Sequence, residues 1–459
     1  MSQSSFSPKY YEFLELIRYD IENSSDKTIE ELKKPRTIDI PIPDNITVNE
    51  VKIDEKYRIK SKEYLENGLK KYEDVVDEKW KYFDNELCGE WIKINDQKDT
   101  GRVILYMFGG GYFMGSSKVS RPITFKLSEI AECSVFAIDY RLAPQYQFPA
   151  PLCDALAAYF YLINPGPEAG FKPFDPKQIV FAGTSAGGGL AVGTALFMRD
   201  IGLPLPSSLV LWSPWVDLTN SMASLWKPEM DKTDFVPKLT SSAYRTCTNI
   251  GPPCPMSIEF LDHVKILAEK IKKKKPNVVG HPSFTKIPRY HFYCANEALA
   301  IPYISPMLAE SLGNLPPILC QVGGGERFLD SNILFSFRAS DPNKYQLPKY
   351  TTTNFANSSF KNPTEVTLEV YDEAFHCFQA FVIDEKISQF SLKRAGDFIK
   401  QHIPNESSDE AESKSIQGKT NVQTTMNAIA INPNCEIREL DMEFLTCLEY
   451  ENIGIFPDV

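Results

Sequence analysis

Several features that define other protein classes are missing from this sequence of 459 residues. No run of residues approaches the ~18 to 20 consecutive apolar side chains that a membrane-spanning helix needs. The polar start, Met-Ser-Gln-Ser-Ser, does not resemble a secretion signal, which has an apolar centre. We therefore expect a cytoplasmic protein without a transmembrane segment, and leave open a peripheral association with the endoplasmic reticulum, lipid droplets or another lipid surface.

The sequence also lacks clustered metal ligands, and acidic residues outnumber basic ones. The ten cysteines have no Cys-x-x-Cys spacing and the chain holds only five histidines, so we expect reduced thiols, no metal and no other cofactor. The net charge of −11 argues against nucleic acid as a partner. Apolar residues, by contrast, make up 43% of the chain, which is enough to bury a large core.

The most informative segment that is present places a serine between two glycines, Gly183-Thr184-Ser185-Ala186-Gly187. An apolar run precedes it and an Ala/Gly-rich run follows it. This spacing is typical of a nucleophile elbow, a sharp turn from a strand into a helix that exposes the serine hydroxyl and requires small neighbours. An ordinary loop before a helix has the same pattern, so the rest of the chain must decide between the two interpretations.

A glycine-rich segment upstream supports the catalytic interpretation. The apolar stretch 103–107 predicts a buried strand, and it leads directly into Phe108-Gly109-Gly110-Gly111. Successive glycines allow backbone N–H groups to turn toward one point, as the oxyanion hole of a serine hydrolase requires. Without Ser185, this segment would be interpreted as a flexible turn. Because it occurs together with Ser185 and upstream of it, it favours serine hydrolase chemistry.

A catalytic serine needs a histidine base, which in this arrangement comes late in the chain. His376 fits best, because it follows the alternating, strand-like stretch 365–371. His402 ends an amphipathic stretch just before a proline and is interpreted as a cation at a helix C-terminus. A structural histidine at a strand end is the alternative for His376.

The acid should lie between the serine and the histidine. A predicted strand at 317–322 opens into a glycine turn that is followed by Glu326 and then by Asp330. A carboxylate here can hold the imidazole in the tautomer that accepts the serine proton. We place Glu326 first, and Asp330, a candidate helix cap, is the rival.

Together these motifs resemble the hormone-sensitive-lipase-like branch of the α/β-hydrolases, and within it the fungal steryl-acetyl-hydrolase-like esterases. The resemblance implies an α/β fold in which a mostly parallel central sheet is flanked by helices and carries a helical cap. It also implies that the oxyanion donors are the backbone N–H groups of Gly110, Gly111 and Ala186. The further matching segments are Asp139-Tyr140-Arg141-Leu142-Ala143-Pro144, Phe148-Pro149-Ala150-Pro151, Ser213-Pro214-Trp215-Val216-Asp217-Leu218, Gly325-Glu326-Arg327 with Asp330, and His376 with Phe378.

One residue departs from the resembled family. Phe108 stands where that family has a histidine that braces the glycine loop through hydrogen bonds. Phenylalanine packs but cannot donate, so the loop must be held differently or less well. The departure motivates an alternative function, a non-catalytic or weakly active protein that binds a small apolar ligand on a hydrolase scaffold.

The chain divides into three expected regions. Residues 1–87 form an N-terminal helical or cap region, and 88–403 form the catalytic domain, whose insertion at 219–303 contributes to the cap and the substrate region. Residues 404–459 form an acidic tail that carries −8 of the net charge. We expect this tail to be a linker followed by an amphipathic helix, because apolar residues recur at helical spacing over 437–448.

The expected function is that of a serine carboxylic ester hydrolase of the carboxylesterase or lipase type, acting through an acyl-enzyme. Aromatic residues near the predicted site favour a substrate with an apolar acyl or alcohol group. The resemblance suggests a small hydrophobic ester, including acetylated sterols or other lipid esters, as the substrate. The oligomeric state is not predicted. The aromatic residues expected near the substrate are Phe113, Trp212, Trp215 and Trp226.

Overall fold

A computed structural model describes residues 5–23, 31, 40–98, 100–237, 258–276, 280–283, 291–347, 355–403 and 425–455. Within these residues, ten strands form one sheet in the order β1-β2-β4-β3-β5-β6-β7-β8-β9-β10. The strands are β1 (Ile46–Ile53), β2 (Leu87–Ile94), β3 (Val103–Met107), β4 (Ser134–Asp139), β5 (Ile179–Thr184), β6 (Ser208–Trp212), β7 (Ile318–Gly323), β8 (Val366–Tyr371), β9 (Met426–Ile431) and β10 (Ile437–Glu439).

The middle of the sheet is parallel and its two ends are antiparallel. Neighbouring strands from β4 to β9 run in the same direction. At one end β2 pairs antiparallel with β4 and β1 with β2, and at the other end β10 pairs antiparallel with β9. Every residue of β3, β5, β6 and β7 is buried, because helices cover both faces of a parallel sheet.

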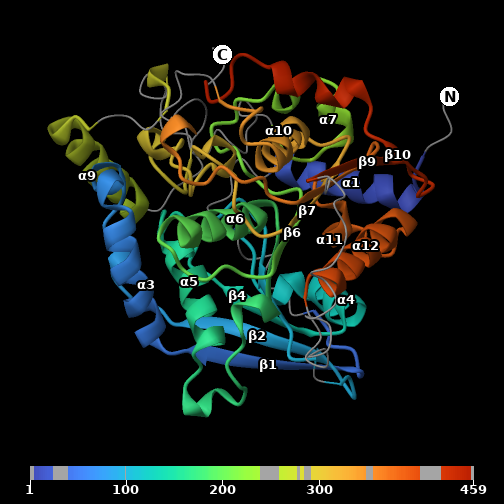
Figure 1. Ribbon diagram of the computed structural model, residues 1–459, viewed down its shortest axis with the longest axis horizontal. Helices are drawn as coiled ribbons and strands as arrows, with labels where there is room; N and C mark the ends of the chain where they lie inside the picture. Colours follow the sequence, from blue (N-terminus) through green and yellow to red (C-terminus); the bar gives the residue numbers. More distant parts are fainter. Residues whose placement is uncertain are drawn as a thin grey trace, which may run out of the picture.

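Helices pack on both faces of this sheet (Figure 1). Helices α4 and α12 pack together on one face, whereas α5 and α6 pack together on the other, with α3 outside α5. The expected α/β architecture with a mostly parallel sheet is confirmed. The helices are α1 (Pro8–Glu22), α3 (Glu55–Gly68), α4 (Arg121–Ala131), α5 (Ala150–Ile163), α6 (Ser185–Asp200), α7 (Met230–Thr233), α9 (Ile258–Lys274), α10 (Leu329–Ser340), α11 (Phe378–Phe381) and α12 (Lys386–His402).

Both outer parts of the chain contribute strands to this sheet, which corrects two expectations. β1 lies inside 1–87, which was expected to be helical, and β9 and β10 lie inside the expected tail 404–459. β9 covers the edge of β8, and this long-range pairing leaves little trace in a local pattern. The expected linker falls mostly outside the described residues.

The helix expected in the tail is a 3₁₀ helix, η12 (Met442–Glu449). Its Phe444, Leu445 and Leu448 side chains are half-buried and pack against the core of the domain, and the helix lies next to α10. Ile437, which was counted in the same helical pattern, instead belongs to β10 and is 50% exposed. Residues 442–449 are therefore helical but 3₁₀ in type, and residues 437–439 form a strand where the apolar spacing predicted helix.

The insertion at 219–303 is described only in part, and residues 238–257 lie outside the described residues. Its described parts include α7, which precedes Asp234, and α9, which ends in a run of lysines. Lys270 of α9 donates to the carbonyl oxygen of Glu73 at 2.6 Å, so the basic end of this helix packs on the N-terminal region. Among the described helices, none combines the length and the apolar character that crossing a membrane would take.

Candidate active site

Ser185 directly follows β5 and is the first residue of α6, at the carboxyl edge of the sheet. Its φ of 50° lies in the left-handed region, which is strained for a residue with a side chain. The flanking glycines are required by space: a Cβ on Gly187 would lie 2.0 Å from the Met107 carbonyl oxygen, and one on Gly183 would lie 2.5 Å from the Gly187 carbonyl carbon. The turn from strand to helix holds the serine half-buried at the helix N-terminus.

His376 and Glu326 lie beside this serine although they are distant in the sequence. His376 Nε2 is 2.8 Å from Ser185 Oγ, and His376 Nδ1 is 3.2 Å from Glu326 Oε1. The histidine is 4% exposed and the glutamate 0%. If Nδ1 donates its proton to the carboxylate, Nε2 is free to accept one from the serine hydroxyl. The structure thus brings together the three side chains selected from the sequence.

The surroundings of His376 favour its charged form. Burial by itself would lower the pKa of the imidazole, but the adjacent Cys377 thiol and the Glu326 carboxylate outweigh it and raise the pKa well above its usual value. The Cys377 sulfur is 3.5 Å from Nε2, so this nitrogen has two close neighbours, the sulfur and the Ser185 hydroxyl. Cys377, the next residue in the chain, therefore contacts the candidate base.

Glu326 is held on its far side as well. Its second oxygen, Oε2, accepts hydrogen bonds from Ser213 Oγ at 2.6 Å and from the Gly323 backbone N–H at 2.8 Å. Asp330, the rival acid, instead accepts from the Ser224 backbone N–H at 2.7 Å in the first turn of α10. Its pKa is raised, mainly by burial. Of the two carboxylates, the structure places Glu326 beside the imidazole.

The glycine loop passes next to the serine. A Cβ on Gly109 would lie 3.1 Å from Ser185 Cβ, and the Gly109 N–H donates to Thr184 Oγ1 at 3.0 Å. Gly110 and Gly111 follow with φ values of 129° and 61°, which favour glycine. On the other side of the serine, the N–H of Ala186 belongs to the first turn of α6, where no preceding turn can satisfy it. The loop and the helix start thus both lie next to the serine, and the role of Gly110, Gly111 and Ala186 as oxyanion donors stays a prediction.

Stacked aromatic rings hold this loop in place of the family histidine. The Phe108 ring is 1% exposed and stacks on Tyr140, with 4.3 Å between ring centroids and 14° between planes. The Tyr140 hydroxyl donates to the Phe108 carbonyl oxygen at 2.7 Å. Further along, Tyr112 stacks on Tyr293 at 3.8 Å. Of the two expectations for Phe108, the structure supports a loop that is held differently.

The aromatic residues expected near the substrate divide into two groups. Trp212 and Trp215 are 0% and 3% exposed and belong to the core, with Trp215 stacked on Phe328. Because both side chains are buried in the core, we do not expect them to contact a substrate directly. Phe113, which follows the glycine loop, and Trp226, in the insertion, are only half-buried. Phe113 lies beside the glycine loop, where a Cβ on Gly111 would meet its ring at 2.9 Å, whereas the position of Trp226 near the substrate stays a prediction.

Two residues with no signal in the sequence lie against the histidine loop. Asp234 accepts a hydrogen bond from the His376 backbone N–H at 3.1 Å. The Tyr10 hydroxyl accepts one from the backbone N–H of the preceding residue, Phe375, at 2.8 Å. Both residues come from regions that were expected to form the cap, Tyr10 from the N-terminal region and Asp234 from the insertion.

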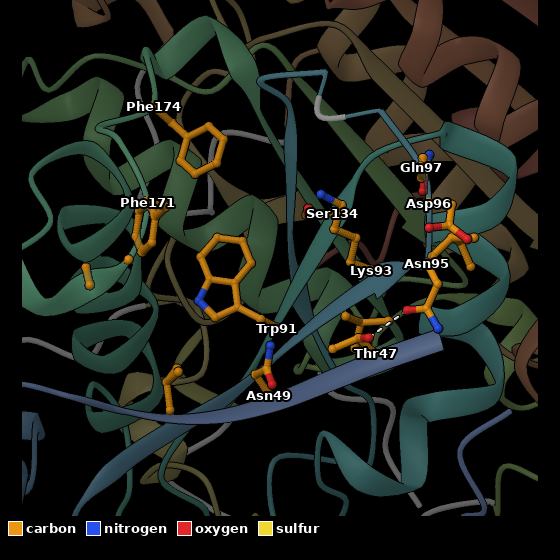
Figure 2. Close-up of a pocket in the computed structure, with 15 residues that line it drawn as sticks. Thr47, Asn49, Trp91, Lys93, Asn95, Asp96, Gln97, Ser134, Phe171 and Phe174 are labelled. Carbon is orange, nitrogen blue, oxygen red and sulfur yellow. Dashed lines mark hydrogen bonds between the residues drawn. The ribbon is translucent and has the colours of Figure 1, made fainter. Parts of the chain in front are cut away.

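A hollow of about 1010 Å³ opens elsewhere on the molecule (Figure 2). Trp91, Phe171 and Phe174 form an aromatic wall on one side of it, opposite polar side chains of the β1 and β2 ends. Ser134, which also lines it, begins β4, whereas Ser185 follows the last residue of the parallel strand β5. This hollow is therefore at the opposite end of the sheet from the candidate catalytic residues.

Comparison with known proteins agrees with this architecture. A family model described as the alpha/beta hydrolase fold matches residues 104–249. An acetyl-hydrolase of Streptomyces hygroscopicus is 39% identical over 135 residues, which are 29% of this chain and 42% of that protein. An esterase of Acinetobacter venetianus is 28% identical over 251 residues, 55% of this chain and 65% of that protein. The chain thus spans less than two thirds of the length of each of these relatives.

Solved structures match over more of the chain. An esterase from the bacterial hormone-sensitive lipase family is 25% identical with a TM-score of 0.54, and the match covers 88% of this chain and 100% of that one. An esterase/lipase from an uncultured bacterium is 24% identical with a TM-score of 0.55, covering 86% of this chain and 99% of that one. The chain therefore has the α/β-hydrolase fold, and its structural neighbours include an esterase of the hormone-sensitive lipase family.

Proposed function

We propose that this protein is a serine carboxylic ester hydrolase. The observation that carries the proposal is the chain of contacts from Ser185 Oγ to His376 Nε2 at 2.8 Å and from His376 Nδ1 to Glu326 at 3.2 Å. A nucleophile, a base and an orienting carboxylate in this order are the parts that acyl transfer needs. The similarity to an esterase and an acetyl-hydrolase supports the same reaction class.

In the acylation half, Ser185 Oγ attacks the ester carbonyl carbon while His376 Nε2 removes the hydroxyl proton. Glu326, buried beside Nδ1, stabilises the imidazolium that forms. The N–H groups of Gly110, Gly111 and Ala186 donate to the oxyanion of the tetrahedral intermediate. The imidazolium then returns its proton to the departing alcohol, which leaves an acyl-serine.

In the deacylation half, water takes the place of the alcohol. His376 removes a proton from the water, which attacks the acyl carbon, and the collapsing intermediate releases the carboxylic acid and restores the Ser185 hydroxyl. The strained φ of the serine keeps its hydroxyl in one place through both halves. No group outside the protein, the ester and water is required.

The substrates we propose are short acyl esters of hydrophobic alcohols. Acetyl is the favoured acyl group because the similar proteins include an acetyl-hydrolase. The half-buried Phe113 beside the glycine loop favours an apolar alcohol, and acetylated sterols or other lipid esters have this character.

A fluorophosphonate probe tests the proposal directly. We expect one adduct, which peptide mapping places on Ser185, and hydrolysis of p-nitrophenyl esters that is fastest for short chains. Ser185→Ala and His376→Ala should each lower the turnover by about 10⁴-fold or more without unfolding the protein. Heat-denatured protein is the labelling control.

Two results would contradict the proposal. The first is an adduct on another serine or on Cys377, whose thiol also faces the imidazole. The second is a native protein that neither labels nor hydrolyses any ester but binds a small apolar molecule tightly, which would favour the ligand-binding alternative.

A further inference from the structure

Three successive backbone N–H groups of the histidine loop, residues 375–377, each donate to a side chain from a different part of the chain. The loop lies between β8 and α11, outside regular secondary structure. Its acceptors come from α1, from the insertion after α7, and from the segment after β6. The three pairs are Phe375 N to Tyr10 Oη at 2.8 Å, His376 N to Asp234 Oδ1 at 3.1 Å and Cys377 N to Ser213 Oγ at 3.0 Å.

Asp234 joins the histidine loop to the acid loop. Its Oδ1 accepts from the His376 N–H, and its Oδ2 accepts from the N–H of Arg327 at 2.9 Å, the residue after Glu326. The side chain is 3% exposed, and burial is the main cause that raises its pKa to about 6. A rigid carboxylate between the two backbones determines how far Glu326 and His376 lie from each other.

Tyr10 fixes the same loop from the N-terminal helix. Its ring is 1% exposed and lies 4.1 Å from the Phe6 ring and 4.6 Å from the Phe375 ring. Leu14, one turn further along α1, is buried in the same cluster. The ring packing sets the position of the hydroxyl, and the hydroxyl sets the position of the Phe375 N–H, one residue before the candidate base.

We propose that Tyr10 and Asp234 are positioning residues that hold the His376 imidazole between Ser185 and Glu326. The inference rests on the proposed function, in which His376 is the base. Proton transfer between positioned groups is sensitive to displacement, and a shift of about 1 Å can lower a rate by about 100-fold. The N-terminal helix and the insertion would then belong to the catalytic machinery rather than only cover it.

The test of Tyr10 is removal of the hydroxyl alone. Tyr10→Phe keeps the ring in its cluster and leaves the Phe375 N–H without this acceptor. We expect kcat on a p-nitrophenyl ester to fall by about 3- to 10-fold with KM unchanged, because the loss affects the base and not the substrate contacts. Tyr11→Phe removes the neighbouring hydroxyl of the same helix and should leave kcat unchanged. Equal effects of the two variants, or none from Tyr10→Phe, would overturn the role of Tyr10.

The test of Asp234 uses the pH profile. Asp234→Asn should lower kcat by about 10- to 100-fold, because an amide cannot accept from both backbones in the same way. Titratable groups around this carboxylate include His376, Glu326 and Tyr10. Its negative charge favours the imidazolium, so its loss should lower the pKa of His376 and move the acid limb of kcat/KM to lower pH. If kcat falls but the acid limb of kcat/KM stays at the same pH, Asp234 has a purely structural role and the proposal is overturned for this residue.

Hydrogen exchange tests the inference without reference to activity. We expect the backbone amides of 375–377 to exchange faster in Tyr10→Phe and in Asp234→Asn than in the native chain or in Tyr11→Phe. A native protein that does not label with the probe would contradict the proposed function and leave this readout intact. Unchanged exchange in both variants, with labelling normal, would overturn the inference alone.

Discussion

Glu326 and Asp330 show how two buried carboxylates of one short segment acquire different roles. Glu326 shares the loop after β7 with the glycine turn, so its side chain reaches His376 at 3.2 Å. Asp330 lies in the first turn of α10 and binds a backbone N–H. Their spacing along the chain allows either carboxylate to be the acid. The geometry of the turn after β7 decides that Glu326, and not Asp330, faces His376.

Replacement of the carboxylate that contacts the imidazole should change both the rate and its pH dependence. We expect Glu326→Gln to lower kcat by about 10³-fold or more, because the imidazolium loses its partner and the tautomer is no longer selected. Glu326 raises the pKa of His376, and the base acts only when unprotonated. The acid limb of kcat/KM should therefore move to lower pH.

The matched control for this change is Asp330→Asn, measured in the same titration. Its carboxylate binds the Ser224 N–H and does not touch the imidazole. The stability of this variant should fall while the position of the acid limb stays unchanged. A larger loss of kcat from Asp330→Asn than from Glu326→Gln would contradict the assignment of the acid.

The Phe108 ring packs next to the glycine loop and should not tolerate a polar replacement. Phe108→His would place a polar ring in a site that is 1% exposed and would weaken the stack on Tyr140. We expect a loss of about 2 kcal/mol in the free energy of unfolding, measured with urea, together with a lower kcat on a short ester. Phe108→Leu, which stays apolar, should lose less stability. A histidine variant that is faster than the native protein would mean that hydrogen-bond partners for it still surround the loop.

At the scale of elements, the β9–β10 hairpin is the part of the chain whose role differs most from expectation. β9 pairs in parallel with β8, the strand that leads to the histidine loop, and Asp372 N donates to Ile431 O at 2.8 Å. Arg438 of β10 forms an ion pair with Asp372 at 2.7 Å. The hairpin therefore braces the strand end from which His376 extends.

Two isoleucines that face each other in this hairpin give a matched test. Ile431 is 0% exposed and packs in the cluster with Tyr10 and Phe375, whereas its register partner Ile437 is 50% exposed. Ile431→Asp should lower the free energy of unfolding by about 3 to 5 kcal/mol, because it buries an unpaired carboxylate and removes apolar contacts. Ile437→Asp should change it by less than about 0.5 kcal/mol. Equal effects in thermal or urea unfolding would place the hairpin away from the core.

At the scale of the whole molecule, a buried ion pair connects the N-terminal region to the sheet and its helices. Arg141 Nε is 2.9 Å from Asp154 Oδ2, and both side chains are 0% exposed. The same guanidinium donates to the carbonyl oxygens of Trp80 at 3.0 Å and Tyr82 at 3.1 Å. The expected boundary at residue 87 is therefore crossed by polar contacts as well as by β1.

Removal of the arginine should destabilise the protein as a whole. Arg141→Met leaves Asp154 buried without its partner, and we expect the free energy of unfolding to fall by about 3 to 5 kcal/mol. The double variant Arg141→Met/Asp154→Leu removes both charges and should recover part of this loss. Circular dichroism and tryptophan fluorescence during urea unfolding measure both. A single variant as stable as the native chain would show that solvent reaches Asp154.

The parts of this protein that depend on local rules could be predicted from the sequence. The glycines around Ser185, the glycine loop and the apolar central strands are required by close backbone approach and by burial on both faces, so they are visible as spacing and composition. Three features depend on long-range packing: which carboxylate faces His376, how Phe108 is held, and the extension of the sheet by the C-terminal hairpin. The same packing also brought Tyr10 and Asp234 to the histidine loop. These contacts join residues far apart in the chain, and their formation depends on the packing of elements that no local pattern records.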